Sequence, residues 1–334
     1  MAEQIPDDRP VRWGILGAGA IARTVSRDIM LTDGNAVAAV GARDGARAAA
    51  FAVEFPDCRS FGSYAELVAD PDIDVVYVAT THPGHHDAAL LAIQAGKPVL
   101  VEKPVCLNAA GAREVLDAAQ QAELFAMEAM WMRTNPLIRK AEQLIDEGAI
   151  GEVRGLRAEF ALGLTFDADD RLFDLNNGGG ALLDLGVYPV TFGYLFLGRP
   201  DQMVASGTLS PTGSDDTTAM QWTHANGAFA QLWCSASAKA PNSGVIFGSQ
   251  GWIATEGAAH RPSGLVVQTA DTRYRLDDPI AGQGSGYGPE IAEVARCLRA
   301  GLTESPLIPH ADTIAIMELL DDARRQVGVK YPGE

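Results

Sequence analysis

The sequence predicts an α/β protein, with a doubly wound parallel sheet in its N-terminal part and an α+β domain with a mostly antiparallel sheet after it. Two observations lead to this fold class. Apolar runs alternate with helical segments over the first 130 residues, which is the order of strands and crossover helices in a parallel sheet. From about residue 131 this order stops, and most later segments alternate apolar and polar residues, as antiparallel strands do. We therefore expect one domain over residues 1–130 and a second over residues 131–334.

Length and composition limit the class of protein. The chain has 334 residues, 47% of them hydrophobic and 21% charged, which is enough for more than one typical domain. Its net charge of −17 repels nucleic acid phosphates and anionic lipid headgroups, so binding to nucleic acid or to a membrane surface is not expected. The acidic, polar start does not resemble a secretion signal. We expect a soluble cytoplasmic protein whose partner is a small molecule.

The cysteines and histidines do not follow a metal-binding pattern. Cys58, Cys106, Cys234 and Cys297 are scattered without a CxxC pair, and the histidines lack a spacing such as HExxH. The sequence therefore predicts free thiols and no metal.

The first apolar run, residues 11–16, predicts a buried strand that leads directly into GAGAIA at residues 17–22. This is a GxGxxA pattern. In a dinucleotide-binding unit, the first glycine makes the tight turn and the second lets the backbone approach a pyrophosphate. Gly17, Gly19, Ala20 and Ile21 are therefore predicted to contact a cofactor. A glycine-lined turn without a ligand is the alternative.

The following segments continue the alternation of strand and helix. The predicted strands are 36–40, 74–80 and 99–102, and the predicted helices are 46–55 and 86–95. Because every second element is a strand, a doubly wound sheet of Rossmann type is the expected arrangement.

The residue after the second strand indicates which cofactor such a sheet binds. An acid there binds the ribose hydroxyls of NAD, whereas a basic residue accommodates the 2′-phosphate of NADP. The sequence has Arg43 at this place, and the paired donors of a guanidinium match a phosphate. We expect NADP, with NAD bound through Asp44 as the alternative.

Lys103 is a candidate for the chemistry, because it comes just after the strand at 99–102, and ligands of open α/β sheets bind at the carboxyl edge. Glu102 precedes it, and Pro104 disfavours helix at Lys103, so the ammonium is presented from a stiff backbone. We predict that Glu102 and Lys103 contact the cofactor. An exposed, solvated lysine is the alternative.

Thr80, His82 and His85 follow the strand at 74–80 and should lie near the same edge. We predict that they contact the cofactor near its nicotinamide end. Solvated loop histidines are the alternative.

The second domain is predicted from the rest of the chain. Its expected elements are a helix at 135–147, a strand at 151–164, an acidic loop at 167–174, a helix after the glycines at 178–180, and strands at 202–209, 217–223, 228–236, 244–248, 251–255, 264–269 and 272–276.

The helix after the three glycines carries Asp184 and Tyr188, which are four residues apart and so share a face. A carboxylate among leucines and valines needs a cation or hydrogen-bond donors, and Lys103 is the natural candidate. Gly186 and Pro189 predict that this helix kinks or starts irregularly. A buried Asp–Tyr pair that only joins two elements is the alternative to an active site.

Three motifs in order resemble the Gfo/Idh/MocA group of nicotinamide-dependent oxidoreductases: GAGAIA at 17–22, AGKPVLVEKP at 95–104 and GGGALLDLGVYP at 178–189. HPGH at 82–85, EAMWMR at 128–133 and RLF at 171–173 are most similar to the branch that contains dihydrodiol dehydrogenases and NADP-dependent xylose dehydrogenases. The resemblance covers nearly the whole chain. The sequence departs from that pattern at Ala42, where NADP-binding members often have serine, and at Gly84, where many have asparagine.

The resemblance implies hydride transfer between a carbinol carbon and a nicotinamide. Tyr188 is the expected acid/base, and because a free phenol has a pKa of about 10, it needs a cation such as Lys103 beside it. Asp184 is expected to orient Lys103 or to bind a substrate hydroxyl, and Trp131 to form an apolar wall for the substrate. The resemblance also implies an open second sheet with a free face, and a homodimer or homotetramer.

We therefore expect an NADP-dependent dehydrogenase that acts on a pyranose sugar or a cyclic polyol. A trans-dihydrodiol dehydrogenase, and a nicotinamide-binding sensor without turnover, are alternatives. Relatives that recycle a tightly held NAD are a third possibility, which Arg43 disfavours.

Overall fold

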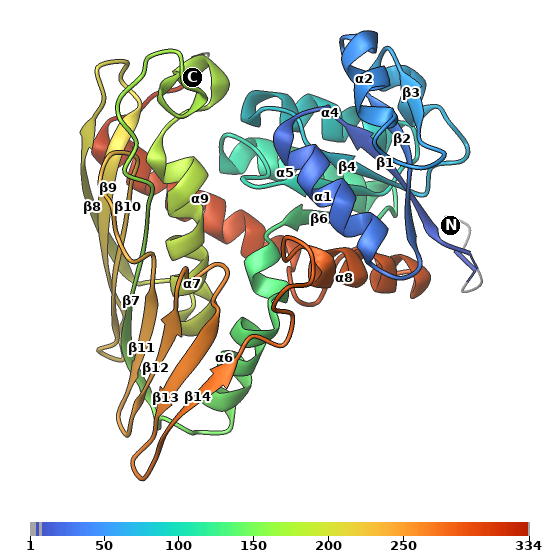
Figure 1. Ribbon diagram of the computed structural model, residues 1–334. Coiled ribbons are helices and arrows are strands. Elements are labelled where there is room, and N and C mark those ends of the chain that lie inside the picture. Colours follow the sequence, from blue (N-terminus) through green and yellow to red (C-terminus); the bar gives the residue numbers. More distant parts are fainter. Residues whose placement is uncertain (1–4, 7–8, 333–334) are drawn as a thin grey trace. The chain divides into compact units, whose positions relative to one another are not determined.

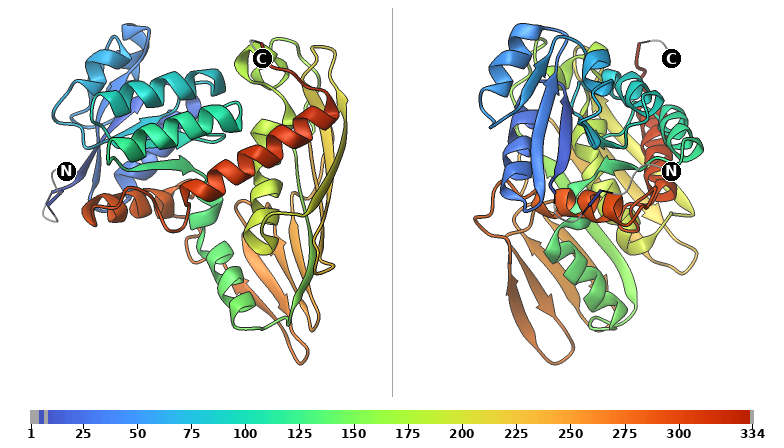
Figure 2. Two further views of the ribbon diagram at one scale, coloured as in Figure 1. Left: turned by 180° about the vertical axis from the view of Figure 1, so that it is seen from behind. Right: turned by 90° about the vertical axis from the view of Figure 1, so that its right-hand side faces the viewer.

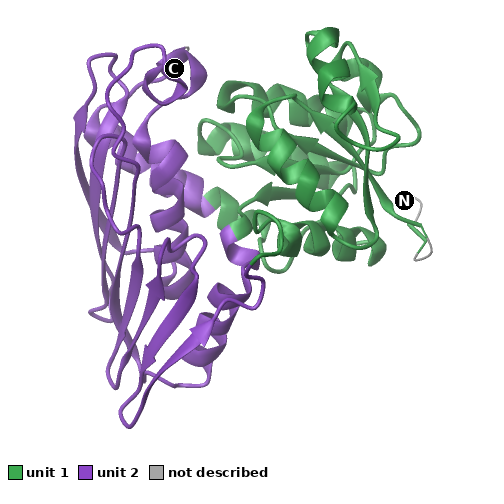
Figure 3. Ribbon diagram, viewed as in Figure 1, with its two compact units in different colours: residues 1–131, 282–314 green, residues 132–281, 315–334 purple. Residues whose placement is uncertain are grey.

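The computed structural model describes residues 5–6 and 9–332, which form two compact units (Figure 3). Unit 1 consists of Met1–Trp131 and Gly282–Ile314, and unit 2 of Met132–Ala281 and Ala315–Glu334. The first division falls after Trp131, and the sequence predicts a domain boundary after residue 130. The sequence assigns residues 282–314 to the second domain, but in the structure they belong to unit 1, because helix α8 (Gly288–Arg299) packs on helix α1 (Ala20–Leu31).

Unit 1 contains a six-stranded parallel sheet with the order β3-β2-β1-β4-β5-β6 (Figure 1). Its strands are β1 (Val11–Leu16), β2 (Asn35–Gly41), β3 (Arg59–Phe61), β4 (Val75–Val78), β5 (Val99–Glu102) and β6 (Ala126–Ala129). The predicted Rossmann sheet is confirmed. The strand order reverses between β1 and β4, which is where such sheets bind dinucleotides.

Helices cover both faces of this sheet (Figure 2). They are α1, α2 (Gly45–Ala52), α3 (Tyr64–Val68), α4 (His82–Gln94), α5 (Ala109–Gln121) and α8. Helix α4 contacts α5, and α1 contacts α8. The predicted start of α4 at residue 86 is wrong. Thr81 is the N-cap and Pro83 lies in the first turn, where a missing backbone N–H costs nothing, so the helix begins at His82.

Unit 2 contains an eight-stranded sheet with the order β14-β13-β12-β11-β7-β10-β9-β8 (Figure 1). Its strands are β7 (Val153–Ala161), β8 (Gln202–Leu209), β9 (Asp215–Thr223), β10 (Phe229–Ser235), β11 (Gly244–Gly248), β12 (Trp252–Glu256), β13 (Gly264–Gln268) and β14 (Arg273–Asp277). Strands β7 and β10 pair in parallel, and the other neighbours pair antiparallel. The predicted fold class is therefore confirmed.

Helices α6 (Pro136–Asp146) and α7 (Val187–Leu197) pack on the sheet of unit 2, and α9 (His310–Val327) begins in unit 1 and ends in unit 2. The helical segment Leu175–Leu197, which includes α7, is long and apolar enough to cross a membrane by composition alone. However, 78% of its apolar window is buried inside the structure, so it is a core helix.

Candidate active site

The carboxyl edge of the sheet in unit 1 brings together every residue that the sequence assigns to the nucleotide. The last residues of β1, β2 and β4 are aligned, since Leu16 pairs with both Gly41 and Val78. Strands β4, β5 and β6 continue the alignment. The predicted cofactor residues all lie at this edge, in the turns that follow these strands, in the first turns of α1 and α4, or at the end of β5: Gly17, Gly19, Ala20, Ile21, Arg43, Thr80, His82, His85, Glu102 and Lys103.

The glycine turn has the geometry that a bound pyrophosphate needs. Gly17 has a φ of 107°, and a Cβ there would lie 2.5 Å from the carbonyl oxygen of Ala79, so only glycine fits. Gly19 is the N-cap of α1, and a Cβ at this position would meet nothing within 4 Å. No side chain caps the helix among the described residues, and its first turn is free of acids, so its N–H groups can bind a phosphate.

Arg43 and Asp44 differ in whether their side chains are available to bind a ligand. The Asp44 carboxylate accepts a hydrogen bond of 2.9 Å from the N–H of Ala46 and so caps α2. The guanidinium of Arg43 is exposed and has no polar partner among the residues that the structure describes. It can therefore bind an anion such as a phosphate at the end of β2.

Lys103 lies in a turn that hydrogen bonds to buried side chains hold in place. Its backbone N–H donates to Glu102 Oε2 at 3.1 Å, and the hydroxyl of buried Tyr77 donates to Glu102 Oε1. Burial and the carboxylate of Glu102 raise the pKa of Tyr77 well above its usual value, so it remains a donor. The Lys103–Pro104 peptide is cis. The side chain of Lys103 is half-buried, so the alternative of a fully solvated lysine is wrong.

His82 and His85 are not the solvated loop histidines of the alternative interpretation, because they are only 6% and 1% exposed. The His85 Nδ1 lies 2.8 Å from the carbonyl oxygen of Pro104. Burial, more than any other effect, lowers the pKa of His85 to about 3. The ring is therefore neutral and donates a single hydrogen bond. His85 thus ties the start of α4 to the turn that carries Lys103.

Trp131 follows the carboxyl end of β6, at the same edge of the sheet, and its ring stacks on Tyr287 at a centroid distance of 4.5 Å. Buried Asp28 on α1 holds the backbone before α8, because it accepts hydrogen bonds of 2.8 Å from Ser285 N–H and 2.9 Å from Tyr287 N–H. The sequence reasoning missed Tyr287. The glycine-rich run at 282–288 is the signal that could have indicated an ordered functional loop there.

In unit 2, the helix that carries Asp184 starts irregularly, as the sequence predicts. Leu182–Gly186 forms a π-helical turn, and α7 follows from Val187. π-helical turns often occur at functional sites. The N–H of Leu182 donates to buried Asp215 at 2.6 Å, which fixes the start of the turn.

Asp184 accepts a hydrogen bond of 2.8 Å from the guanidinium of Arg171, so a cation that the sequence reasoning missed satisfies it within its own unit. The signal was present, because Arg171 belongs to the RLF motif and a buried carboxylate requires a cation.

Tyr188 is 7% exposed and lies in a cluster of aromatic rings. Its ring centroid is 4.7 Å from that of His260 and 5.5 Å from that of Phe160. Neither neighbour was predicted, because both come from segments without a recognised motif. Unit 2 therefore supplies a phenol in an aromatic setting and a carboxylate paired with a guanidinium, which suit proton transfer and the binding of a hydroxyl group.

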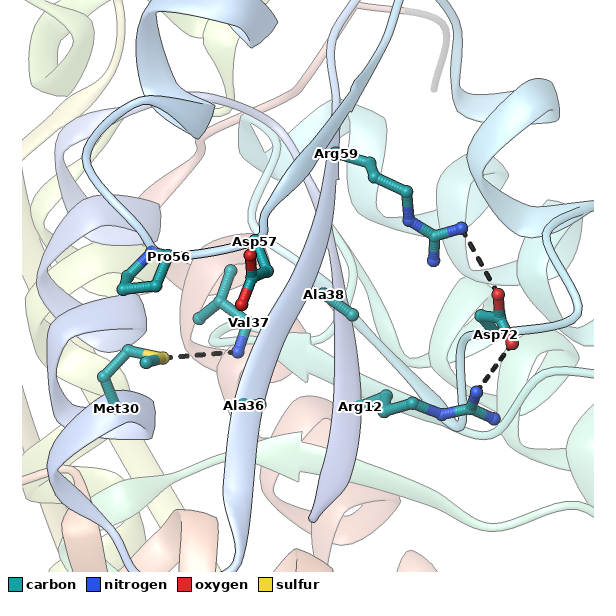
Figure 4. A pocket seen from close by; sticks show the side chains of 9 residues that line it. All are labelled: Arg12, Met30, Ala36, Val37, Ala38, Pro56, Asp57, Arg59 and Asp72. Atoms are coloured by element: carbon teal, nitrogen blue, oxygen red, sulfur yellow. Dashed lines mark hydrogen bonds and ion pairs between the residues drawn. The ribbon is translucent and has the colours of Figure 1, made fainter. Parts of the chain in front are cut away.

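A cavity of about 440 Å³ in unit 1 is lined by Arg12, Met30, Ala36, Val37, Ala38, Pro56, Asp57, Arg59 and Asp72 (Figure 4). Arg12 and Ala36 are near the amino ends of β1 and β2, opposite to the glycine turn. Both arginines that line it are already engaged, since Asp72 pairs with Arg12 and with Arg59. This cavity is therefore not the nucleotide site.

Family models match both parts of the chain. Residues 11–129 match an oxidoreductase family with an NAD-binding Rossmann fold, and residues 138–254 match the Gfo/Idh/MocA C-terminal domain. The trans-1,2-dihydrobenzene-1,2-diol dehydrogenases of Mus musculus and Danio rerio are 38% and 37% identical, over 96% of this chain and 98% of theirs.

A solved structure is also similar over the full length. A 3-ketoreductase from Actinomadura kijaniata, in complex with NADP and TDP-benzene, is 26% identical, with a TM-score of 0.85 over 96% of this chain and 98% of that one. The chain therefore belongs to the Gfo/Idh/MocA oxidoreductases, and it is a dehydrogenase that binds NAD(P) through the Rossmann sheet of unit 1.

Proposed function

We propose that this protein is an NADP-dependent dehydrogenase that oxidises a CH–OH group of a trans-dihydrodiol or a closely related cyclic diol. The sequence alone favours a pyranose sugar, with the trans-dihydrodiol as the alternative. The curated relatives support the opposite order, because they are named trans-1,2-dihydrobenzene-1,2-diol dehydrogenases and match over nearly the whole chain.

The aromatic setting of Tyr188 is the observation that carries this proposal. Phe160 and His260 pack beside the phenol with ring centroids within 5.5 Å. A sugar presents hydroxyl groups around most of its ring, and their desolvation beside aromatic rings costs free energy. A dihydrobenzene diol has one apolar edge and two adjacent hydroxyls, which suits such a surface better. Trp131, stacked on Tyr287, is a second apolar wall in the proposal.

In the proposed reaction, the C–H bond of the carbinol carbon breaks and its hydrogen leaves with the electron pair as hydride. Bound NADP would supply the hydride acceptor. Tyr188 first releases its own proton to solvent, and its phenolate Oη then accepts the hydroxyl proton of the substrate, which restores the phenol. The ammonium group of Lys103 stabilises negative charge on the phenol and on the substrate oxygen, and Asp184 binds the second hydroxyl of the diol. Three groups of this chain, Tyr188, Lys103 and Asp184, thus orient the diol and handle one proton, with no role for a metal.

The choice of NADP rests on the end of β2. Arg43 is exposed and has no polar partner within the described part of the chain, while Asp44 is engaged as the cap of α2. An engaged carboxylate is less available to the ribose hydroxyls of NAD. The similar 3-ketoreductase is in complex with NADP, which supports the same choice.

The direct test follows the absorbance of reduced nicotinamide with trans-1,2-dihydrobenzene-1,2-diol, an aldose panel and inositols, each with NADP and NAD. We expect the diol with NADP to give the highest kcat/KM. Lys103→Met and Tyr188→Phe should reduce kcat by about 100-fold or more, while the Kd of NADPH stays near the wild-type value. Faster oxidation of an aldose than of the diol would reject the substrate class. Tight NADPH binding without any turnover would favour the sensor.

We also propose that the protein is a homo-oligomer that associates through the outer face of the eight-stranded sheet. This face carries exposed apolar side chains, with Val204 68% and Phe229 40% exposed, and Phe229 stacks on Phe247 at 6.5 Å. Light scattering after size exclusion should give a dimer or tetramer, and Val204→Lys should shift it towards the monomer. A wild-type monomer at micromolar concentration would reject this association.

We also propose that the protein is located in the cytoplasm.

A further inference from the structure

The aromatic rings of Tyr188, Phe160 and His260 form a closed cluster in unit 2. The His260 ring lies 4.7 Å from the Tyr188 ring at an interplanar angle of 33°, and 4.4 Å from the Phe160 ring at 36°. Phe160 contacts Tyr188 edge-on, at 5.5 Å and 64°. Each ring therefore contacts both of the others, and the His260 ring packs against the phenol ring at a tilt of 33°.

Asn242 joins the two segments that carry the neighbouring rings. Its side-chain Oδ1 accepts a hydrogen bond of 2.8 Å from the N–H of Ala161, next to Phe160 on β7. Its backbone carbonyl accepts one of 2.6 Å from the N–H of Ala259, next to His260. Asn242 has a φ of 63°, a conformation that asparagine tolerates better than most residues. The positions of Phe160 and His260 are thus set together.

The helix that carries Tyr188 is less able to fix the phenol by itself. The preceding turn, Leu182–Gly186, is π-helical, and Pro189 directly after Tyr188 lacks a backbone N–H. Contacts between side chains must therefore contribute to the orientation of the ring.

We propose that His260 is a positioning residue for Tyr188: its imidazole packs against the phenol ring and, with Phe160, holds the hydroxyl in the direction needed for proton transfer. This inference rests on the proposed function, in which Tyr188 handles the substrate proton. A planar ring is required at position 260, whereas an aliphatic side chain of similar size cannot stack on the phenol.

The test compares His260→Leu, which removes the planar ring, with His260→Phe, which keeps it. His260→Leu should lower kcat for the diol by about 10- to 100-fold, as expected for a misplaced reactive group, and leave the Kd of NADPH unchanged. His260→Phe should restore most of kcat. His224→Ala, a histidine in the turn between β9 and β10, is the matched control and should behave as wild type. Wild-type kcat in His260→Leu, or equal losses in both variants, would overturn the proposal.

A second measurement does not depend on turnover. Near-ultraviolet circular dichroism reports aromatic rings in fixed asymmetric packing. The difference between wild type and Tyr188→Phe should identify the signal of Tyr188, which His260→Leu should weaken and His260→Phe should preserve. If the wild-type protein oxidises no substrate, the proposed function fails, but this comparison still decides whether His260 positions Tyr188. An unchanged signal in His260→Leu would reject the positioning role.

Discussion

The carboxylate of Asp184 accepts a hydrogen bond of 2.8 Å from the guanidinium of Arg171, and the two residues connect the short helical turn Arg171–Phe173 (η2) to the π-helical turn before α7. The side chain of Asp184 is 12% exposed and that of Arg171 is 45% exposed. The carboxylate is thus the buried partner, and it depends more on the pair than the guanidinium does.

This asymmetry predicts that Arg171→Leu damages both stability and activity. A mostly buried carboxylate that loses its donor should cost about 1–3 kcal/mol of unfolding free energy, and kcat/KM for the diol should fall because Asp184 turns towards another donor. Adding Asp184→Asn should recover part of the lost stability, because the uncompensated charge disappears. Urea unfolding and steady-state kinetics measure these effects.

Arg275→Leu is the matched control, since Arg275 pairs with Glu256 near the surface of the same unit, with side chains 45% and 37% exposed. Such pairs contribute little to stability. Equal losses in Arg171→Leu and Arg275→Leu would contradict a special role of the Arg171–Asp184 pair.

A second prediction concerns the support of Lys103. Tyr77→Phe removes the hydroxyl that donates to Glu102, and the freed carboxylate then holds the backbone N–H of Lys103 less firmly. We expect kcat to fall by about 10-fold or more, with little change in the Kd of NADPH. Tyr64→Phe, on α3 away from this turn, is the control and should keep the wild-type kcat. A wild-type rate in Tyr77→Phe would show that Glu102 orients the turn without help.

The sequence predicts most of the fold because its signals are local. The strands from β8 to β14 are found within two residues of their predicted ends, since alternation and glycines mark them directly. The three-residue strand β3 (Arg59–Phe61) is too short and polar for such a signal. No local sequence pattern indicates that residues 282–314 belong to unit 1, because this assignment depends on the packing of α8 against α1.

The residues of the candidate site also divide into those that the sequence predicts and those that it does not. Residues in turns after parallel strands could be predicted, because the sheet aligns the ends of those strands. The sequence reasoning missed Arg171, His260 and Tyr287. Motifs mark the segments of Arg171 and Tyr287, but the role of each residue depends on which side chain it meets in space: Asp184, Tyr188 and Trp131.

A third prediction concerns cofactor choice. Arg43→Ala removes the exposed guanidinium at the end of β2 and should raise the KM for NADP by about 10- to 100-fold, as the loss of a charged phosphate contact would. The KM for NAD should hardly change, because NAD has no 2′-phosphate. The ratio of kcat/KM for the two cofactors measures this effect. Asp44→Asn, which keeps an N-cap acceptor, is the control. An equal loss with both cofactors would contradict a phosphate contact.

The last prediction concerns the pH dependence of stability. Asp215 is 2% exposed, and burial raises its pKa to about 6, although it accepts hydrogen bonds from Leu182 N–H at 2.6 Å and from the Thr218 hydroxyl at 3.2 Å. The carboxyl group has a pKa of 3.8 when unperturbed, so the folded state holds its proton more tightly than the unfolded state does. Below pH 3.8 both states are protonated, and the group does not affect the folding equilibrium.

As the pH rises from 3.8 to about 6, the unfolded chain loses this proton first, so the unfolding free energy falls. Above about pH 6 both states are ionised and the loss stays constant, at about 3 kcal/mol for a shift of about two pKa units. Asp215→Asn keeps an oxygen that can accept from Leu182 N–H but does not titrate. Its stability relative to wild type should therefore rise by about 3 kcal/mol between acidic and neutral pH. Urea unfolding of both proteins across this range measures the difference, and a difference that does not vary with pH would show that the start of the Tyr188 helix is not held by a carboxyl group of raised pKa.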